Sequence, residues 1–363
     1  MNQTLKTAGL AILMACVLNC QNLSAQTTSV TKAEAEKLSI ELEQSINKGD
    51  PEMLNHLIYF PEFIARTGSK NPIINNFDTL TKIANGFGLF NIGNNTLQIS
   101  KNGSYNLVRG FVLNEEMHLL FRAYGDGGLN YQDITLIKIK DSVKAADIFS
   151  YQLGESYARL FSYLITDMAT PDAHSSMTSR EKYGNLFENA MRNKNYPVAR
   201  SAFEKFDEAT QNDKHFSLQY MLACQHLSDK LFRKSVDHFV ALFPEEPTAY
   251  LLMVAAYADT KEYGEYGHAI DKLDTLIHID PFLDYLRGNL EMKLDDSRTA
   301  LHFYQEVFNY DPGIWQNTEK LVALKVVNNE LVQANDAINV YSHTPGYRKE
   351  LVESLYASYP VLK

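Results

Sequence analysis

This chain has few of the residues that form covalent cross-links or metal sites. It contains only three cysteines among 363 residues, and two of them, Cys16 and Cys20, lie in the N-terminal segment described below. Cys224 is then left without a partner, so we expect no disulfide. Paired-cysteine motifs, His-Glu-x-x-His and histidine pairs four residues apart are all absent from the sequence. We therefore predict that none of its ten histidines belongs to a metal site.

Sequence signatures of cofactor chemistry are missing as well. There is no Gly-x-Ser-x-Gly motif, no phosphate-binding Walker loop and no Rossmann glycine pattern. The Gly-rich run at 125–128 joins two expected strands, which is typical of a hairpin turn. We therefore predict no cofactor. A net charge of −10 also disfavours nucleic acid and anionic membrane surfaces as partners.

The sequence has one long apolar run, from Ala8 to Leu18, preceded by a single lysine and followed by Leu23-Ser24-Ala25. This pattern predicts a secretory signal peptide over residues 1–25 and export to the periplasm or outside the cell. A transmembrane helix would need about 20 apolar residues. The residues around Cys16 resemble a lipoprotein box, but apolar residues follow it, so a lipid anchor at Cys16 is the less favoured alternative.

Helical patterns follow the leader, and from residue 97 the apolar period changes to two. A capping-box spacing at Thr31–Glu34 and the pair Asp50-Pro51 start two helices, and a third is expected around 75–84. Strands are expected at 97–101, 104–113, 116–124, 130–140 and 143–152, before a closing helix at 155–168. These elements predict an α+β domain over 30–168 with helices on an antiparallel sheet, and a linker at 169–179.

The element order and the opening "INKGDPEMLNHLI" resemble the NTF2-like (SnoaL-like) family. The resemblance implies that helices cover a strongly curved sheet around a pocket, in the shape of a cone. A sheet packed flat on the helices, without a pocket, stays open as an alternative.

A longer repeat appears beyond the linker. Prolines at 247, 281, 312 and 345 are spaced by 31 to 34 residues, and each follows a helical pattern with a small residue twelve positions earlier in three units. The segments "LDTLIHIDP" and "FYQEVFNYDP" resemble the ends of tetratricopeptide (TPR) repeats. The resemblance implies an all-α solenoid over 180–345 with a concave binding surface, followed by a capping helix within 346–363.

The expected strands place several polar side chains inside the cone. If the strand registers coincide, one cluster forms from these ligand-binding candidates: Arg122, Tyr124, Tyr131, Asp133, Asp147 and Tyr151. In a structural interpretation Arg122 neutralises one or both aspartates, because a buried charge needs a partner. In a functional interpretation the pocket is open, and an aspartate beside a tyrosine acts as a general base.

These patterns favour an exported, bacterial-type, non-catalytic scaffold that binds a protein or peptide in the repeat groove. Helical position alone suggests these groove candidates: Gln225, Tyr285, Arg287, Asn289 and Lys293. A homodimer through the sheet is a further option. The alternative function is a cone-domain enzyme with isomerase-like or dehydratase-like acid–base chemistry, or a small-ligand binder, with the repeats as a targeting arm.

Overall fold

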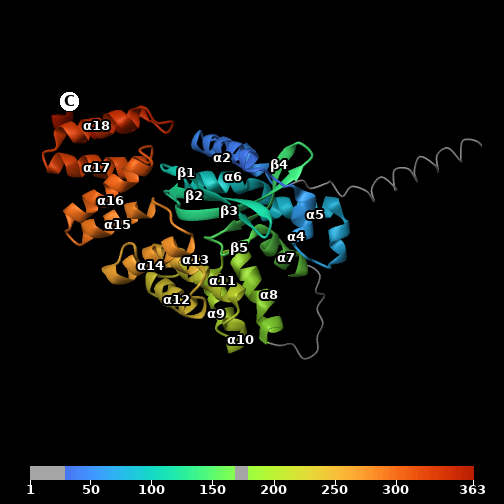
Figure 1. The fold of residues 1–363 in the computed structure, drawn as a ribbon. Coiled ribbons are helices and arrows are strands. Elements are labelled where there is room, and N and C mark those ends of the chain that lie inside the picture. Colours follow the sequence, from blue (N-terminus) through green and yellow to red (C-terminus); the bar gives the residue numbers. More distant parts are fainter. Residues whose placement is uncertain (1–28, 168–178) are drawn as a thin grey trace, which may run out of the picture.

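The computed structural model describes residues 29–167 and 179–363. We call 29–167 the sheet layer and 179–363 the helical array. Helices lie on one face of the sheet, and the array curves around the other face (Figure 1). The expected leader and all but the last residue of the expected linker lie outside the described residues. No helix in the described part of the chain is both long and apolar enough to span a bilayer.

Short helices precede the sheet. They are α2 (Lys32–Asn47), α3 (Glu52–Asn55), α4 (Phe60–Arg66), α5 (Phe77–Phe87) and α6 (Ile92–Ile99), with 3-10 turns η1 (Pro72–Asn75) and η2 (Leu89–Asn91). The capping box expected at the start of α2 is present: Thr31 accepts a hydrogen bond from the Glu34 amide, and the Glu34 carboxylate accepts one from the Thr31 amide. The strand expected at 97–101 is wrong, because residues 92–99 form α6.

The sheet is an antiparallel meander of five strands in sequence order. The strands are β1 (Ser104–Leu113), β2 (Glu116–Gly125), β3 (Gly128–Ile139), β4 (Ser142–Ser150) and β5 (Glu155–Ser156), and α7 (Tyr157–Asp167) follows. The four strands expected after residue 103 are therefore confirmed to within about two residues. Irregular register near Leu107 and Thr135 bends β1 and β4 against their neighbours.

The two faces of the sheet belong to different cores. Leu119, Phe121 and Ala123 of β2 pack with the helices of the sheet layer. Leu120 and Tyr131 pack with side chains of the helical array. Alternation along β2 thus sends successive residues into two separate cores, as the period-two pattern predicts. A strongly curved cone around a pocket stays a prediction.

The helical array consists of helix pairs. They are α8 (Ser179–Arg192) with α9 (Tyr196–Phe203), α11 (Lys214–Gln225) with α12 (Asp229–Leu242), α13 (Pro247–Tyr257) with α14 (Tyr263–Leu276), α15 (Leu283–Lys293) with α16 (Ser297–Tyr310), and α17 (Trp315–Val327) with α18 (Leu331–Ser342). The short α10 (Glu208–Gln211) precedes α11, and α19 (Lys349–Ser358) with η3 (Pro360–Leu362) ends the chain. The chain therefore contains the TPR-like helical solenoid that the repeat predicts.

Close contact between the two helices of a pair explains why small residues recur in the repeat pattern of this chain. Ala269 and Ala300 are fully buried on the second helices of their pairs. A methyl group added at Gly288 of α15 would come within 2.5 Å of the Tyr304 ring on α16. Small side chains at these points let the helices approach closely enough to share one core.

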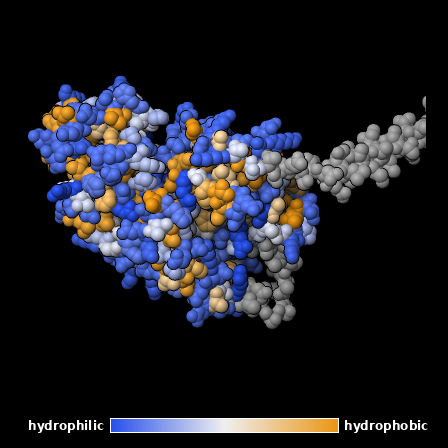
Figure 2. Space-filling view, viewed as in Figure 1, coloured by the Kyte–Doolittle hydropathy of each residue, from blue (hydrophilic) through white to orange (hydrophobic). Residues whose placement is uncertain are grey.

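The concave side of the array faces the sheet. Side chains of β2 and β3 share a core with α11, α13 and α15, and the Gln316 side chain of α17 bonds to the Asn102 carbonyl before β1. The face of the molecule drawn in Figure 2 is mostly hydrophilic, with hydrophobic side chains scattered over it. The sheet layer therefore occupies much of the surface that a solenoid normally offers to a partner.

Candidate functional site

A buried ion pair joins the sheet layer to the helical array. Arg122 of β2 is fully buried, and its Nη1 donates to both carboxylate oxygens of Asp280, at 2.6 and 2.9 Å. Asp280 is also fully buried and lies in the turn between α14 and α15. The Tyr131 hydroxyl donates to the same carboxylate at 2.9 Å. Two charges removed from water are thus compensated by each other and by a third hydrogen bond.

Aromatic rings surround the ion pair. The Arg122 guanidinium lies 4.1 Å from the centre of the Phe282 ring, and the Tyr124 ring also packs against Phe282, at 4.7 Å between ring centres. Burial alone would lower the pKa of Arg122, but the charge and hydrogen bonds of Asp280 raise it above its ordinary value. Arg122 therefore stays protonated in this apolar setting, and we call Arg122, Tyr131, Asp280 and Phe282 the latch.

The turn that carries Asp280 is strained. His278 and Ile279 both have left-handed backbone angles, with φ of 61° and 73°. A β-branched residue rarely adopts this conformation, which costs roughly 1–2 kcal/mol. Since the Ile279 side chain is 70% exposed, its own packing does not offset that cost. Hydrogen bonds do: the Ile279 and Asp280 amides donate to the carbonyl and carboxylate of Asp274.

The partner expected for Arg122 was wrong. Asp133 lies 2.8 Å from His118 Nδ1 and makes its hydrogen bond there. Asp147 accepts hydrogen bonds from the amides of Ile148 at 2.8 Å and Ala158 at 3.0 Å, so it holds the first turn of α7. The expectation failed because Arg122 finds its counter-ion 158 residues away in sequence.

The remaining cone candidates lie on the face of the sheet that the helical array covers. Tyr124 and Tyr151 are half-buried against the core shared with the array, and Tyr131 is fully buried in it. Burial and the nearby Asp133 raise the pKa of Tyr151 to about 12, so its hydroxyl is neutral near pH 7. Arg122, Tyr124, Tyr131 and Tyr151 thus share one face, as expected, and the array covers it.

Asp147 provides a test by pH. Burial raises the pKa of Asp147 above its ordinary value of 3.8, although the hydrogen bonds from Ser156 and from two amides oppose this. A raised pKa means that the aspartic acid stabilises the fold below pH 4 and that this contribution is lost as the pH rises through the folded-state pKa. We expect the stability of Asp147→Asn, relative to the unsubstituted chain, to improve as the pH rises from 4 to 7, because only the unsubstituted chain loses this contribution.

Urea denaturation at a series of pH values measures this difference. The matched control is Asp141→Asn, which removes the same charge from an exposed turn of the same hairpin. An identical pH dependence in both variants would show that overall charge, rather than burial, is responsible.

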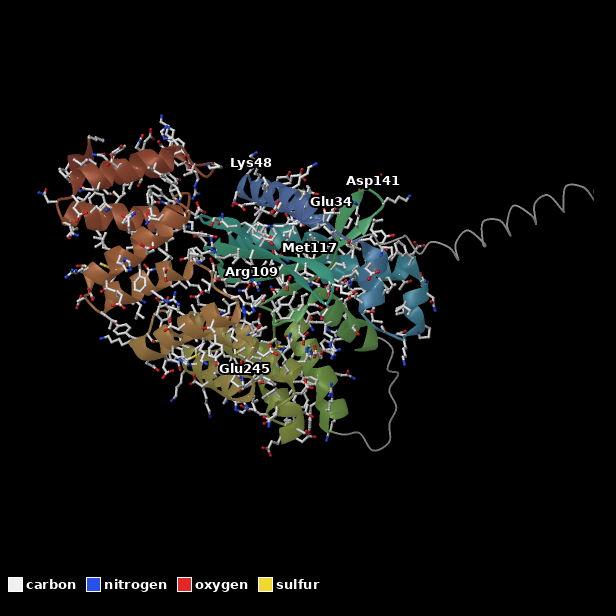
Figure 3. All side chains as sticks on the ribbon, in the orientation of Figure 1. Glu34, Lys48, Arg109, Met117, Asp141 and Glu245 are labelled. Atoms are coloured by element: carbon white, nitrogen blue, oxygen red, sulfur yellow. The ribbon has the colours of Figure 1, made fainter. Side chains whose placement is uncertain are left out.

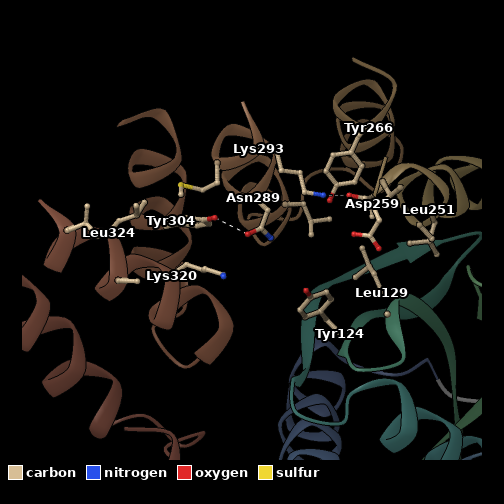
Figure 4. Close-up of a pocket in the computed structure, with 18 residues that line it drawn as sticks. Tyr124, Leu129, Leu251, Asp259, Tyr266, Asn289, Lys293, Tyr304, Lys320 and Leu324 are labelled. Carbon is tan, nitrogen blue, oxygen red and sulfur yellow. Dashed lines mark hydrogen bonds between the residues drawn. The ribbon is translucent and has the colours of Figure 1, made fainter. Parts of the chain in front are cut away.

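A groove of about 670 Å³ lies beside the latch, between the β2–β3 hairpin and the array (Figure 4). Tyr124, Gly128 and Leu129 form the hairpin wall. The opposite wall comes from the first helices of three successive pairs, α13, α15 and α17, and is mainly apolar: Val254, Ala255, Leu286, Met292, Leu324 and Val327. Met292 and Val327 are 40% and 75% exposed, so apolar surface continues to the groove's mouth.

Few polar groups reach this groove. Asn289 uses its side-chain oxygen to accept a hydrogen bond from the Tyr304 hydroxyl at 2.9 Å. Lys293 donates to the Ala258 carbonyl, and exposed Lys320 extends from α17 into the space facing Tyr124 (Figure 4). Asp259 supplies one carboxylate. The volume and the mostly apolar lining fit a ligand-binding site, with two ammonium groups for orientation.

The five residues that the sequence suggested for the groove lie at different sites in the structure. Asn289 and Lys293 line the groove. Tyr285 is buried beside Tyr124 and Phe282, so it belongs to the junction of the two layers. Arg287 bonds to three aspartates, and Gln225 is exposed at the end of α11.

Sequence reasoning missed Asp280, Phe282 and Lys320. Asp280 was visible only as part of the repeat ending "HIDP", where an aspartate before proline bonds to the amide two residues later. Asp311 makes the same local bond to Gly313 in the next repeat. The local role is therefore readable from the sequence, whereas the contact with Arg122 is not.

Comparison with known proteins gives limited similarity. No model of a known protein family and no curated protein matches this chain. Two solved structures of MamA are similar to half of it: a crystal structure of MamA at 15% identity and a TM-score of 0.40, covering 95% of that chain, and MamA from residue 41 onward of Desulfovibrio magneticus RS-1 at 16% identity and a TM-score of 0.39, covering 98% of that chain.

Proposed function

We propose that this protein is a scaffold that binds a segment of a protein partner in the groove between the β2–β3 hairpin and α13, α15 and α17. The observation that carries the proposal is the apolar wall built by three successive repeats, which continues to exposed Met292 and Val327 at its mouth. Exposed apolar surface of this kind marks interaction sites. The enzyme alternative has less support, because Asp133 and Asp147 are engaged with His118 and with backbone amides.

The charges of the groove indicate the chemistry of the segment. Lys293 and Lys320 provide two positive charges against the single negative charge of Asp259. The chain as a whole carries a net charge of −10, so a positive groove is a local exception. An apolar segment with one or two acidic residues complements this surface. The proposal includes export by a leader at 1–25, a division into units at 30–168 and 180–345, and an NTF2-like cone fold of the first unit.

A displayed library of random peptides tests the proposal. We expect the immobilised protein to enrich peptides that combine apolar residues with Asp or Glu. Ala255→Trp places an indole in the groove from an exposed position and should weaken binding of the enriched peptides at least tenfold. Lys320→Glu should select against the acidic residues.

The matched control is Ala357→Trp, which adds the same side chain at an exposed site on α19. It should bind the enriched peptides like the unsubstituted protein. Enriched peptides that bind Ala255→Trp with unchanged affinity would place binding elsewhere, and a library that yields no enrichment would count against a peptide-binding role.

A further inference from the structure

Within the described residues, one edge of the sheet is covered over only half its length. Strand β1 is at the edge, and α2 covers its first half: the Asn47 side chain bonds to both the amide and the carbonyl of Tyr105, and the Glu43 carboxylate accepts from the Leu107 amide. Toward its N-terminus α2 leaves this edge, because Glu34 bonds to Lys138 of β3 (Figure 3). The second half of β1, residues 109–113, is left beyond this cover.

The strand register shows which main-chain groups point outward there. Tyr105 and Leu107 of β1 pair with Ala123 and Phe121 of β2. Their amides point away from β2, because they donate to side chains of α2. Alternate residues of an antiparallel strand repeat this orientation, and after the irregularity at 107–109 the corresponding pairs are Gly110 with Leu119 and Val112 with Met117. Gly110 and Val112 therefore direct four hydrogen-bonding groups outward from the edge.

Residues 110–113 carry no side chain of the types that prevent another strand from pairing with an edge. Natural edge strands usually carry lysine, proline or an inward charge that prevents another strand from adding. Residues 110–113 read Gly-Phe-Val-Leu, and Val112 and Leu113 are 63% and 49% exposed. A glycine within a strand often marks close approach of another backbone, and Gly110 is exposed.

We infer that this edge pairs with the same edge of a second copy of the chain, which would form one sheet of ten strands. An antiparallel arrangement about a two-fold axis at Phe111 places Gly110 opposite Val112 of the second copy, and all four outward groups then form two pairs of hydrogen bonds. The Val112 side chain would lie beside a residue that has no side chain. This surface is distinct from the groove.

Charge at the two ends of the segment favours a second copy in this orientation. Arg109 precedes the uncharged run, and its Nε is buried without a hydrogen-bond partner in the described residues. Exposed Glu115 follows the run. Antiparallel pairing brings the basic end of one strand to the acidic end of the other, whereas parallel pairing would place like charges together.

Sedimentation velocity over a concentration series tests the inference with the full chain. We expect a reversible dimer whose dissociation constant rises about tenfold or more in Val112→Lys and in Gly110→Pro. The proline removes an outward amide that β2 does not use, so the sheet itself should persist. Val332→Lys, at a 71% exposed site on α18, is the control and should dimerise normally.

Disulfide trapping fixes the register. With Cys16, Cys20 and Cys224 replaced by alanine, Phe111→Cys faces itself across the axis at a Cα separation of about 4.5 Å, within the range of a disulfide. Leu113→Cys is about 13 Å from its counterpart along the strand and should not cross-link. A monomer at all concentrations, or a dimer that Val112→Lys leaves intact, would overturn the inference.

Discussion

Replacing Asp280 with alanine is expected to lower the free energy of unfolding by about 3–5 kcal/mol. The substitution leaves the Arg122 guanidinium fully buried with no carboxylate beside it and removes the acceptor of the Tyr131 hydroxyl. An unpaired buried charge has no compensation for its lost hydration. Urea denaturation followed by circular dichroism, and by the fluorescence of Trp315 on α17, measures the loss.

Two further variants separate the ion pair from the turn. Asp311→Ala removes the equivalent aspartate of the next repeat, whose carboxylate accepts a hydrogen bond from Gly313 in its own turn, and should cost about 0.5–1.5 kcal/mol. The double substitution Arg122→Met with Asp280→Leu removes both charges and should cost less than Asp280→Ala alone. If Asp280→Ala and Asp311→Ala cost the same, the ion pair contributes nothing beyond the local bond.

Phe282→Ala is expected to cost a similar 3–5 kcal/mol for a different reason. Phe282 is fully buried, and its ring contacts the Arg122 guanidinium and the rings of Tyr124 and Tyr285. Truncation removes apolar contact area and leaves a cavity at the junction of the two layers, where two separate parts of the chain must both move to fill it.

Thermal and urea unfolding of Phe282→Ala measure this effect, with Phe303→Ala as control. Phe303→Ala is the same substitution at a half-buried position on α16, and it should lower the free energy of unfolding by about 1 kcal/mol. Equal losses at the two positions would show that the junction is no more tightly packed than the outer side of the array.

Local patterns predicted the elements of this fold well. Alternation along "EMHLLFRAY" separated Leu120 and Arg122 from Leu119 and Phe121, and the structure places these pairs in different cores. The proline spacing located the helix pairs. The failure at 97–101 has a physical reason, because a short apolar run such as Leu97-Gln98-Ile99 fits a strand or the end of a helix equally well.

The candidate site was predictable only in part, because its contacts join distant segments. The sequence indicated that Arg122 is buried and needs a counter-ion, and it supplied Asp133 and Asp147 as the nearest acids. It gave no information on which face of the repeats lies against the sheet. The choice of Asp280 depends on that docking geometry, and so does the groove between Leu129 and Lys320.

The separation of Arg122 and Asp280 by 158 residues has a consequence for biogenesis. The sheet is synthesised long before the turn that neutralises its arginine, so a nascent chain that ends before residue 280 exposes a charged and apolar sheet face together. Closing a loop of this length is slow compared with forming local helices. We therefore expect final docking to follow synthesis of the turn after α14, and we expect the sheet face to be open to chaperones that recognise exposed apolar surface until then.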